Sequence, residues 1–246
     1  MIGGVLVLAA GKSSRIAAVS GGMPKPLIPV GGTPVLERNL RWLASEGVSD
    51  LWINLHYRPE AIQAAIGDGS RFGIRVRYSH EPHILGTAGA WKKLAPQWSG
   101  TSLVVYGDNL VQFGLGAFVA RHRACGAPAT ITLFDPAVHR NTGIAGGHVQ
   151  LQDGSVRRFI EGPRPFEGGP YYVNAGAYLL EPSLASFVGD GFQDFARDLF
   201  PSLASAGRLA GHVLEPAGYC LGIDTPASLA RAHDLVADLP VSSGRS

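Results

Sequence analysis

The sequence VLVLAAGKSSR at residues 5–15, followed by MPKPLIPV at residues 23–30, decides the fold of this chain and indicates its chemistry. The first four residues have the pattern of a buried strand, which ends at two alanines and a glycine that allow close backbone approach to a ligand. Backbone N–H groups in such a turn can point at a phosphate. Lys12 and Arg15 add positive charge, and prolines stiffen the segment that carries Lys25. The two stretches therefore predict a strand followed by a polyphosphate-binding loop.

Two better known nucleotide-binding loops do not fit this stretch. Residues 11–13 match the end of the P-loop motif GxxxxGK[ST], but the first glycine of that motif would fall at Leu6, inside the strand. The dinucleotide fingerprint GxGxxG is also absent.

The two stretches together resemble the sugar-1-phosphate nucleotidyltransferases, whose signature reads LAAGxG[TS]R followed by xPKxxxPV. Ser13 stands where that family usually has glycine. The resemblance implies that Arg15 is a catalytic residue that acts on the leaving pyrophosphate, and that Lys25 is one that acts on the α-phosphate. The nucleotide-binding residues that it implies in this loop are Leu8, Ala9, Ala10, Gly11, Lys12, Ser13 and Ser14.

The amino-acid composition is typical of a compact globular chain. Its 246 residues are 46% hydrophobic, so it can bury a full core. The 21 basic and 19 acidic residues leave a net charge of +2, and the cations are dispersed, which argues against nucleic-acid and membrane partners. Only Cys125 and Cys220 are present, and there is neither a leader nor an apolar run approaching the about 18 residues of a membrane span. We expect a cytoplasmic protein.

Alternating patterns predict an α/β fold. Strand patterns at residues 3–9, 51–55, 74–78 and 101–106 alternate with helical patterns at 34–46, 59–66 and 86–95. This alternation is typical of βαβ units, so we expect a mostly parallel central sheet flanked by helices. The family resemblance implies the Rossmann-like nucleotidyltransferase fold, which is similar to GT-A.

The second half is less regular and predicts a mixed sheet. Strand-like runs at 129–134, 156–160 and 171–180 are separated by Gly- and Pro-rich turns. No repeat or linker divides the chain, so we expect one domain over residues 1–240 with a closing helix. Its parts are a nucleotide-binding half at 1–110, a sugar-phosphate-binding half at 111–225, the helix at 226–237 and a tail at 241–246.

Two carboxylates are candidate metal ligands. Asp108 follows an apolar strand and Gly107, at the end of a strand where Mg²⁺ could be held beside a polyphosphate; a turn or helix cap is the alternative. In the resembled family this is the catalytic, metal-binding GD aspartate. Asp224 lies in LGIDTP, where many members read D[IV]GTP, so aspartate and glycine have exchanged places at Gly222. We expect Asp224 to reach the ion from a shifted backbone; loss of the second ligand and a helix-capping role are the alternatives.

The segment HEPHILGTAGA at residues 80–90 resembles the family's ExxxLGT[AG]GA. The resemblance implies nucleotide-binding roles for Glu81, Gly86 and Thr87, because small residues let a flat base approach the backbone. An ordinary helix start is the alternative.

The acceptor side is implied by four further residues. The resemblance assigns sugar-phosphate binding to Asn109, Gly143, Glu161 and Asn174. Glu161 matches the acid of the family's EKP, but the lysine is replaced by Gly162. The arginines that we consider as replacements are Arg140, Arg157, Arg158 and Arg164.

The resemblance implies an enzyme that transfers a nucleoside monophosphate from an NTP to a sugar 1-phosphate, with Mg²⁺ as cofactor and pyrophosphate as second product. GTP and a mannose- or heptose-type acceptor are favoured, and a homodimer is compatible with the sequence. The alternatives are a uridylyl-, thymidylyl-, cytidylyl- or molybdopterin-type transferase, a non-catalytic nucleotide-sugar-binding homologue, and a kinase or ATPase.

Overall fold

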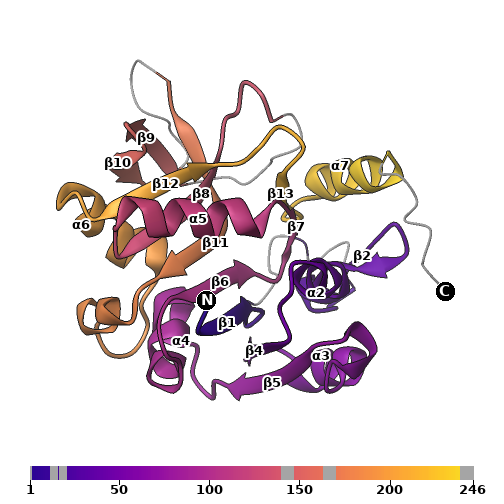
Figure 1. The fold of residues 1–246 in the computed structure, drawn as a ribbon. Helices are drawn as coiled ribbons and strands as arrows, with labels where there is room; N and C mark the ends of the chain where they lie inside the picture. Colours follow the sequence, from indigo (N-terminus) through magenta and orange to yellow (C-terminus); the bar gives the residue numbers. More distant parts are fainter. Residues whose placement is uncertain (1, 12–15, 17–20, 140–146, 163–169, 239–246) are drawn as a thin grey trace.

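The structure is a computed structural model that describes residues 2–11, 16, 21–139, 147–162 and 170–238. Its centre is a nine-stranded sheet with the strand order β5-β4-β1-β6-β11-β8-β12-β10-β9 (Figure 1). The residues of our predictions that lie outside the described part are Lys12, Ser13, Ser14, Arg15, Arg140, Gly143, Arg164 and the tail at 241–246.

The first half of the sheet is parallel, as predicted. Strand β1 (Gly4–Leu8) pairs with β4 (Asp50–Leu55) on one side and β6 (Ser102–Tyr106) on the other, and β4 pairs with β5 (Arg75–His80). The β1 side chains are almost fully buried because helices cover both faces of the sheet.

Helices form the outer layers on the two faces. Val5 and Val7 of β1 share a core with α2 (Val35–Ser45), α3 (Pro59–Ile66) and α5 (Leu115–Cys125). Leu6 and Leu8 point to the opposite face, where α4 (Gly86–Leu94) and α6 (Phe200–Ser205) pack. Successive β1 residues therefore serve different layers, as the two-residue period of a strand requires.

The second half of the sheet is mixed. Strand β11 (Tyr172–Leu180) runs antiparallel to both β6 and β8 (Ala129–Phe134), while β12 (Leu209–Val213) is parallel to β8. Strand β10 (Ser155–Ile160) pairs with β12 and with β9 (His148–Gln152). The three strand-like runs of this half are confirmed, whereas β9 and β12 were not predicted.

Smaller elements complete the site end of the molecule. Strand β7 (Asn109–Gln112) pairs with β13 (Tyr219–Gly222), and β2 (Pro29–Val30) pairs with β3 (Thr33–Pro34). The closing helix is α7 (Pro226–Ala237), which packs beside β13 and β2 (Figure 1). Its N-cap is Thr225, in a capping box with Ser228, so the capping role considered for Asp224 belongs to the next residue.

Short 3-10 and π-helical segments complete the fold. They are η2 (Lys25–Leu27), η3 (Ser70–Phe72), η4 (Ala95–Gln97), η5 (Pro182–Phe187) and the π-helical η6 (Phe195–Leu199).

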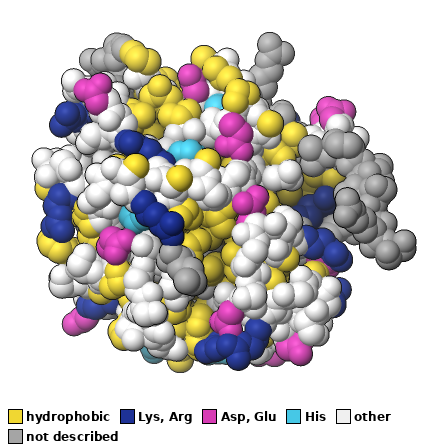
Figure 2. Space-filling model, viewed as in Figure 1, with side chains coloured by type: hydrophobic (Ala, Val, Ile, Leu, Met, Phe, Trp, Pro, Cys, Tyr) yellow, Lys and Arg dark blue, Asp and Glu magenta, His cyan; other side chains and the backbone are white. Residues whose placement is uncertain are grey.

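The surface carries mixed charge. On the face in Figure 2, Lys and Arg side chains are scattered among Asp and Glu, in agreement with the dispersed cations of the sequence. Within the described part of the chain, every helix is too short or too polar to cross a membrane.

Candidate active site

The carboxyl ends of three parallel strands bring the β1 loop and Asp108 together. Leu8 is in register with Asn54 of β4 and Tyr106 of β6, so the residues after each strand meet at one edge of the sheet. The Gly107 N–H donates to the Leu8 carbonyl at 2.8 Å, and a Cβ at position 107 would lie 2.9 Å from that oxygen. Only glycine therefore allows this approach.

Lys25 joins the two predicted metal ligands. Its Nζ donates to Asp108 Oδ2 at 2.9 Å and to Asp224 Oδ1 at 2.8 Å. Lys25 is 5% exposed, whereas the two aspartate side chains keep 28% and 24% of their surface. Burial on its own would lower the pKa of Lys25, but the two carboxylates outweigh it and raise that pKa above 10.5. The ammonium is therefore charged at neutral pH.

Strand alternation explains how Asp224 enters this cluster. Leu221 and Ile223 are buried in the core beneath α7, while the Cys220 thiol contacts the Ala175 carbonyl on the other side. Positions 222 and 224 share the parity of Cys220. The exchange of glycine and aspartate moves the carboxylate by two residues, from position 222 to position 224. The carboxylate therefore stays on the side that faces Asp108.

A buried hydrogen-bond chain supports the β1 loop from below. The Ala9 N–H donates to Asn54 Oδ1 at 2.8 Å, and Asn54 Nδ2 donates to Glu81 Oε1 at 2.8 Å. Glu81 Oε2 accepts from the Leu85 N–H at 3.0 Å, and Glu81 is 2% exposed. Both of its oxygens are engaged by the protein, so the structure places Glu81 under the pocket and not among its lining residues.

A pocket of about 230 Å³ opens above these groups. Predicted residues that line it are Leu8, Ala9, Ala10, Gly11, Gly86, Thr87 and Asp108. Lining residues that the sequence analysis missed are Pro26, Asn54, Ile84, Tyr106, Phe192 and Asp194. Asn54 and Tyr106 could have been found from their places at the carboxyl ends of strands. Asp194 is distant in sequence from the predicted pocket residues, and no local sequence motif marks it as a site residue.

Thr87 ties the start of α4 to the wall formed by residues 192–194. Its hydroxyl donates to Asp194 Oδ2 at 2.9 Å and accepts from the Phe195 N–H at 2.9 Å. Thr87 lines the pocket, as predicted, and its hydroxyl also holds Asp194 at the pocket wall.

The structure separates the predicted acceptor residues. Glu161 and Asn174 lie close together, because a Cβ at Gly147 would be 3.4 Å from Glu161 Oε2 and 2.9 Å from Asn174 Cβ. Asn174 Nδ2 donates to the Tyr178 hydroxyl at 2.8 Å. Asn109 is buried instead, with its amide facing Cys220 Sγ at 3.8 Å, and it is not among the lining residues.

The pair Asp108 and Asp224 suits a hard divalent cation. Mg²⁺ is commonly held by one or two carboxylates together with substrate phosphates and water. The two oxygens converge here on a single positive group, the Lys25 ammonium. Among the described residues, no group of three or more His, Cys, Asp or Glu side chains could hold a metal.

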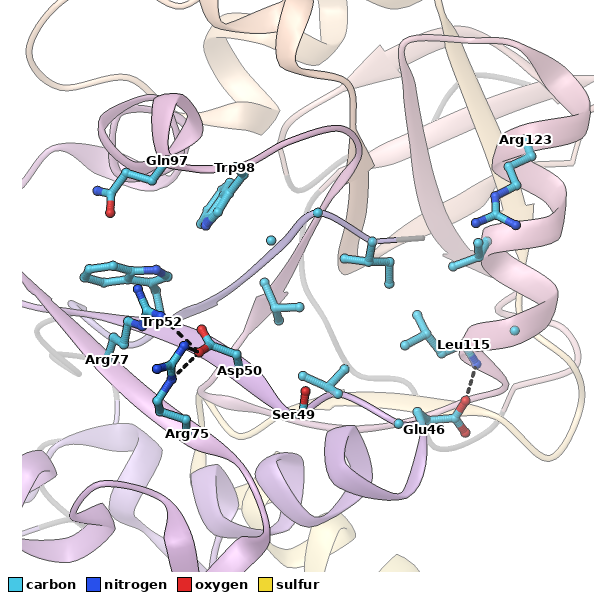
Figure 3. A pocket seen from close by; sticks show the side chains of 18 of the residues that line it. Glu46, Ser49, Asp50, Trp52, Arg75, Arg77, Gln97, Trp98, Leu115 and Arg123 are labelled. Atoms are coloured by element: carbon cyan, nitrogen blue, oxygen red, sulfur yellow. Dashed lines mark hydrogen bonds and ion pairs between the residues drawn. The ribbon is translucent and has the colours of Figure 1, made fainter.

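A larger cavity of about 790 Å³ lies at the opposite end of the strands (Figure 3). It is lined by the first residues of β1, β4 and β5 and by α5, with Asp50 accepting from Arg75 and Arg77. Ligands in open α/β sheets bind beyond the carboxyl ends of strands, which is the edge of the smaller pocket. We therefore locate the candidate active site in the smaller pocket.

A mixed sheet that is parallel around β1, with Lys25, Asp108 and Asp224 clustered beyond the carboxyl ends of its parallel strands, defines an α/β protein with its candidate site at that edge. The family model described as nucleotidyl transferase matches residues 4–238, and the chain belongs to this family.

Relatives and solved structures agree with this family. The chain is 33% identical over 216 residues to a UTP–glucose-1-phosphate uridylyltransferase of Synechocystis sp., covering 82% of this chain and 55% of the relative. It is 29% identical to a mannose-1-phosphate guanylyltransferase of Mycobacterium tuberculosis, covering 94% and 64%. The chain thus spans between one half and two thirds of the length of these relatives.

The fold is shared with HddC from Yersinia pseudotuberculosis, at a TM-score of 0.78 and 23% identity, over 96% of this chain and 100% of that one. A putative glucose-1-phosphate thymidylyltransferase from Bacillus anthracis gives the same TM-score at 21% identity, over 96% of each chain. The predicted Rossmann-like nucleotidyltransferase fold is confirmed.

Proposed function

We propose that this chain transfers a nucleoside monophosphate from an NTP to a sugar 1-phosphate, forming an NDP-sugar and pyrophosphate. The observation that carries the proposal is the Lys25 ammonium between Asp108 and Asp224, at the edge of the sheet where the β1 loop begins. Several relatives are named mannose-1-phosphate guanylyltransferases, and HddC was solved in complex with GMP-PN, which supports GTP and a mannose-type acceptor. The heptose-type acceptor rests on the resemblance of the sequence alone. The uridylyltransferase relative supports UTP as the second candidate donor.

The reaction requires charge stabilisation and no general base. A phosphate oxygen of the sugar 1-phosphate attacks the α-phosphorus; a new P–O bond forms, the α–β bridging bond breaks, and its electron pair leaves on pyrophosphate. The attacking oxygen is already ionised at neutral pH. Lys25 exchanges its carboxylate partners for oxygens of the α-phosphate, where negative charge develops. We assign Arg15 to the leaving pyrophosphate on the strength of the family signature, and Lys12 to nucleotide binding.

Asp108 and Asp224 would hold the Mg²⁺ ion that the family implies. When bound, such an ion neutralises phosphate charge and orients the two reactants. The contribution of the chain is to keep both carboxylates on one side of the pocket, which the pairing of β7 with β13 achieves.

The pocket walls are proposed to hold the nucleotide through the β1 loop, Gly86 and Thr87. We assign Glu81 a positioning role, because its buried carboxylate holds Asn54 and the Leu85 N–H. Glu161 and Asn174 are proposed to contact acceptor hydroxyls. The unpaired state of Cys125 and Cys220 supports a cytoplasmic location.

A panel of NTPs against sugar 1-phosphates tests the proposal, with pyrophosphate and phosphate measured separately. We expect pyrophosphate to form only when both substrates are present, fastest with GTP and mannose 1-phosphate or a heptose 1-phosphate. Release of phosphate would indicate a kinase or ATPase. Nucleotide binding without turnover across the panel would indicate a non-catalytic homologue.

A further inference from the structure

The π-helical turn η6 carries a charged residue at the pocket that the sequence analysis did not consider. Asp194 caps this turn, with Oδ1 accepting from the N–H groups of Ala196 at 3.0 Å and Arg197 at 3.3 Å. The same carboxylate lines the pocket and accepts from Thr87. Single π-helical turns are rare in proteins as a whole, but those that occur often lie at functional sites. The turn therefore holds Arg197 in a fixed relation to the pocket wall.

The Arg197 guanidinium lies over the ring of Phe192, a residue that lines the pocket. Its Cζ is 5.4 Å from the centre of the Phe192 ring, and Phe192 lines the pocket while 48% exposed. Among the residues that the structure describes, the guanidinium forms no hydrogen bond and no ion pair within 4 Å. An arginine stacked on an aromatic ring keeps its donors available for a planar or tetrahedral oxyanion.

The wall around Arg197 is acidic. Burial and the nearby Asp194 raise the pKa of Glu161. The positive charge of Arg197 lowers that pKa, so Arg197 and Glu161 attract each other. A sugar 1-phosphate is an anion, and two carboxylates on the acceptor side repel it unless a cation stands near them.

The backbone at Gly162, next to Glu161, does not favour a cation there. Gly162 has a φ of 149°, a conformation that L side chains rarely adopt. A lysine at this position would be strained, which favours a cation supplied by another element.

We infer that Arg197 binds the phosphate of the sugar 1-phosphate acceptor, in the place of the cation that Gly162 does not supply. The inference rests on the proposed function, and it names a specificity residue contributed by η6. Arg197 is assigned to the acceptor and not to the nucleotide because η6 packs against β10, the strand that leads directly to Glu161.

Substitution of Arg197 tests this assignment through the two Michaelis constants. For Arg197→Ala we expect the KM for sugar 1-phosphate to rise about tenfold, as for loss of one charge-assisted hydrogen bond, with the KM for the NTP within about twofold of wild type. Arg197→Lys keeps the charge, so its KM should fall between the two.

The matched control is Arg208→Ala. Arg208 Cζ lies 4.6 Å from the centre of the Phe187 ring, which is 54% exposed, so the variant removes an equivalent surface pair that does not line the pocket. We expect both KM values to be unchanged.

Calorimetric titration of mannose 1-phosphate into the wild type and Arg197→Ala, each with a non-hydrolysable GTP analogue, keeps the two proposals separable. If the wild type makes no pyrophosphate, the proposed function fails, and the titration still compares acceptor binding. Equal acceptor affinity in both proteins, or a rise confined to the KM for the NTP, would overturn the role of Arg197.

Discussion

At Lys25, one ammonium forms ion pairs with the carboxylates of both Asp108 and Asp224. The side chain is nearly buried and is held by Pro24 and Pro26 in a single helical turn, so its position does not depend on a bound ligand. A cation that the fold holds at this place can stabilise phosphate charge that develops beside it. Lys25 is therefore the residue on which the proposed reaction most depends.

Lys25→Met removes the charge and keeps much of the side-chain length. We expect kcat for pyrophosphate release to fall about 10²- to 10³-fold, the effect typical of losing one charge-stabilising donor. Arg41→Ala is the control, because Arg41 pairs with Glu37 on the exposed surface of α2. A Lys25→Met enzyme with kcat within a few-fold of wild type would remove Lys25 from the chemistry.

The same residue predicts a pH dependence of stability. The folded-state pKa of Lys25 is raised above the ordinary value of 10.5, so its stabilising contribution is complete below pH 10.5 and is lost as pH rises through the folded pKa. Urea unfolding should show wild type more stable than Lys25→Met by about 1–3 kcal/mol at pH 8. That difference should shrink above pH 10.5, and a difference that grew there would contradict the assigned sign.

At the scale of elements, the ends of β4 and β5 are joined by the Asn54 and Glu81 pair. Both Glu81 oxygens accept bonds from buried or half-buried donors, so the carboxylate sets the relation between the β1 loop and the start of α4. The family motif at residues 81–90 therefore includes a residue that shapes the site from outside the pocket.

Glu81→Ala leaves the Asn54 amide and the Leu85 N–H without this acceptor. We expect a loss of about 2–3 kcal/mol in the free energy of unfolding, measured in urea, because each buried unsatisfied donor is costly. Glu60→Ala, at an exposed position of α3, should change stability by less than about 0.5 kcal/mol. Equal stability of Glu81→Ala and wild type would show that the network is not structural.

Elements also show what the sequence could predict. The parallel strands were predictable because their apolar runs and intervening helical patterns are local. Asp224 could be placed beside Asp108 because a shift of two residues preserves the side of a strand. Asp194 and Arg197 could not be predicted, since their approach to Thr87 and Glu161 depends on packing across more than a hundred residues or on a π-helical turn. The burial of Asn109 likewise follows from the β7–β13 pair and not from its motif.

For the whole molecule, the sheet separates two cavities of different character. The larger one lies among the amino ends of the parallel strands (Figure 3), and the smaller one lies at their carboxyl ends. We assign the reaction to the smaller cavity because the β1 loop and Asp108 line it, and Lys25 joins Asp108 to Asp224. Cavity volume alone would place the active site in the larger cavity, at the amino ends of the strands.

A crystal structure of the protein with Mn²⁺ and a non-hydrolysable GTP analogue tests that assignment most directly, because anomalous scattering locates the ion. We predict Mn²⁺ density beside Asp108 and Asp224, the triphosphate along the β1 loop, and Lys25 Nζ on an α-phosphate oxygen. Nucleotide found in the cavity at the amino ends of the strands, with Lys25 still bound to both aspartates, would contradict the account.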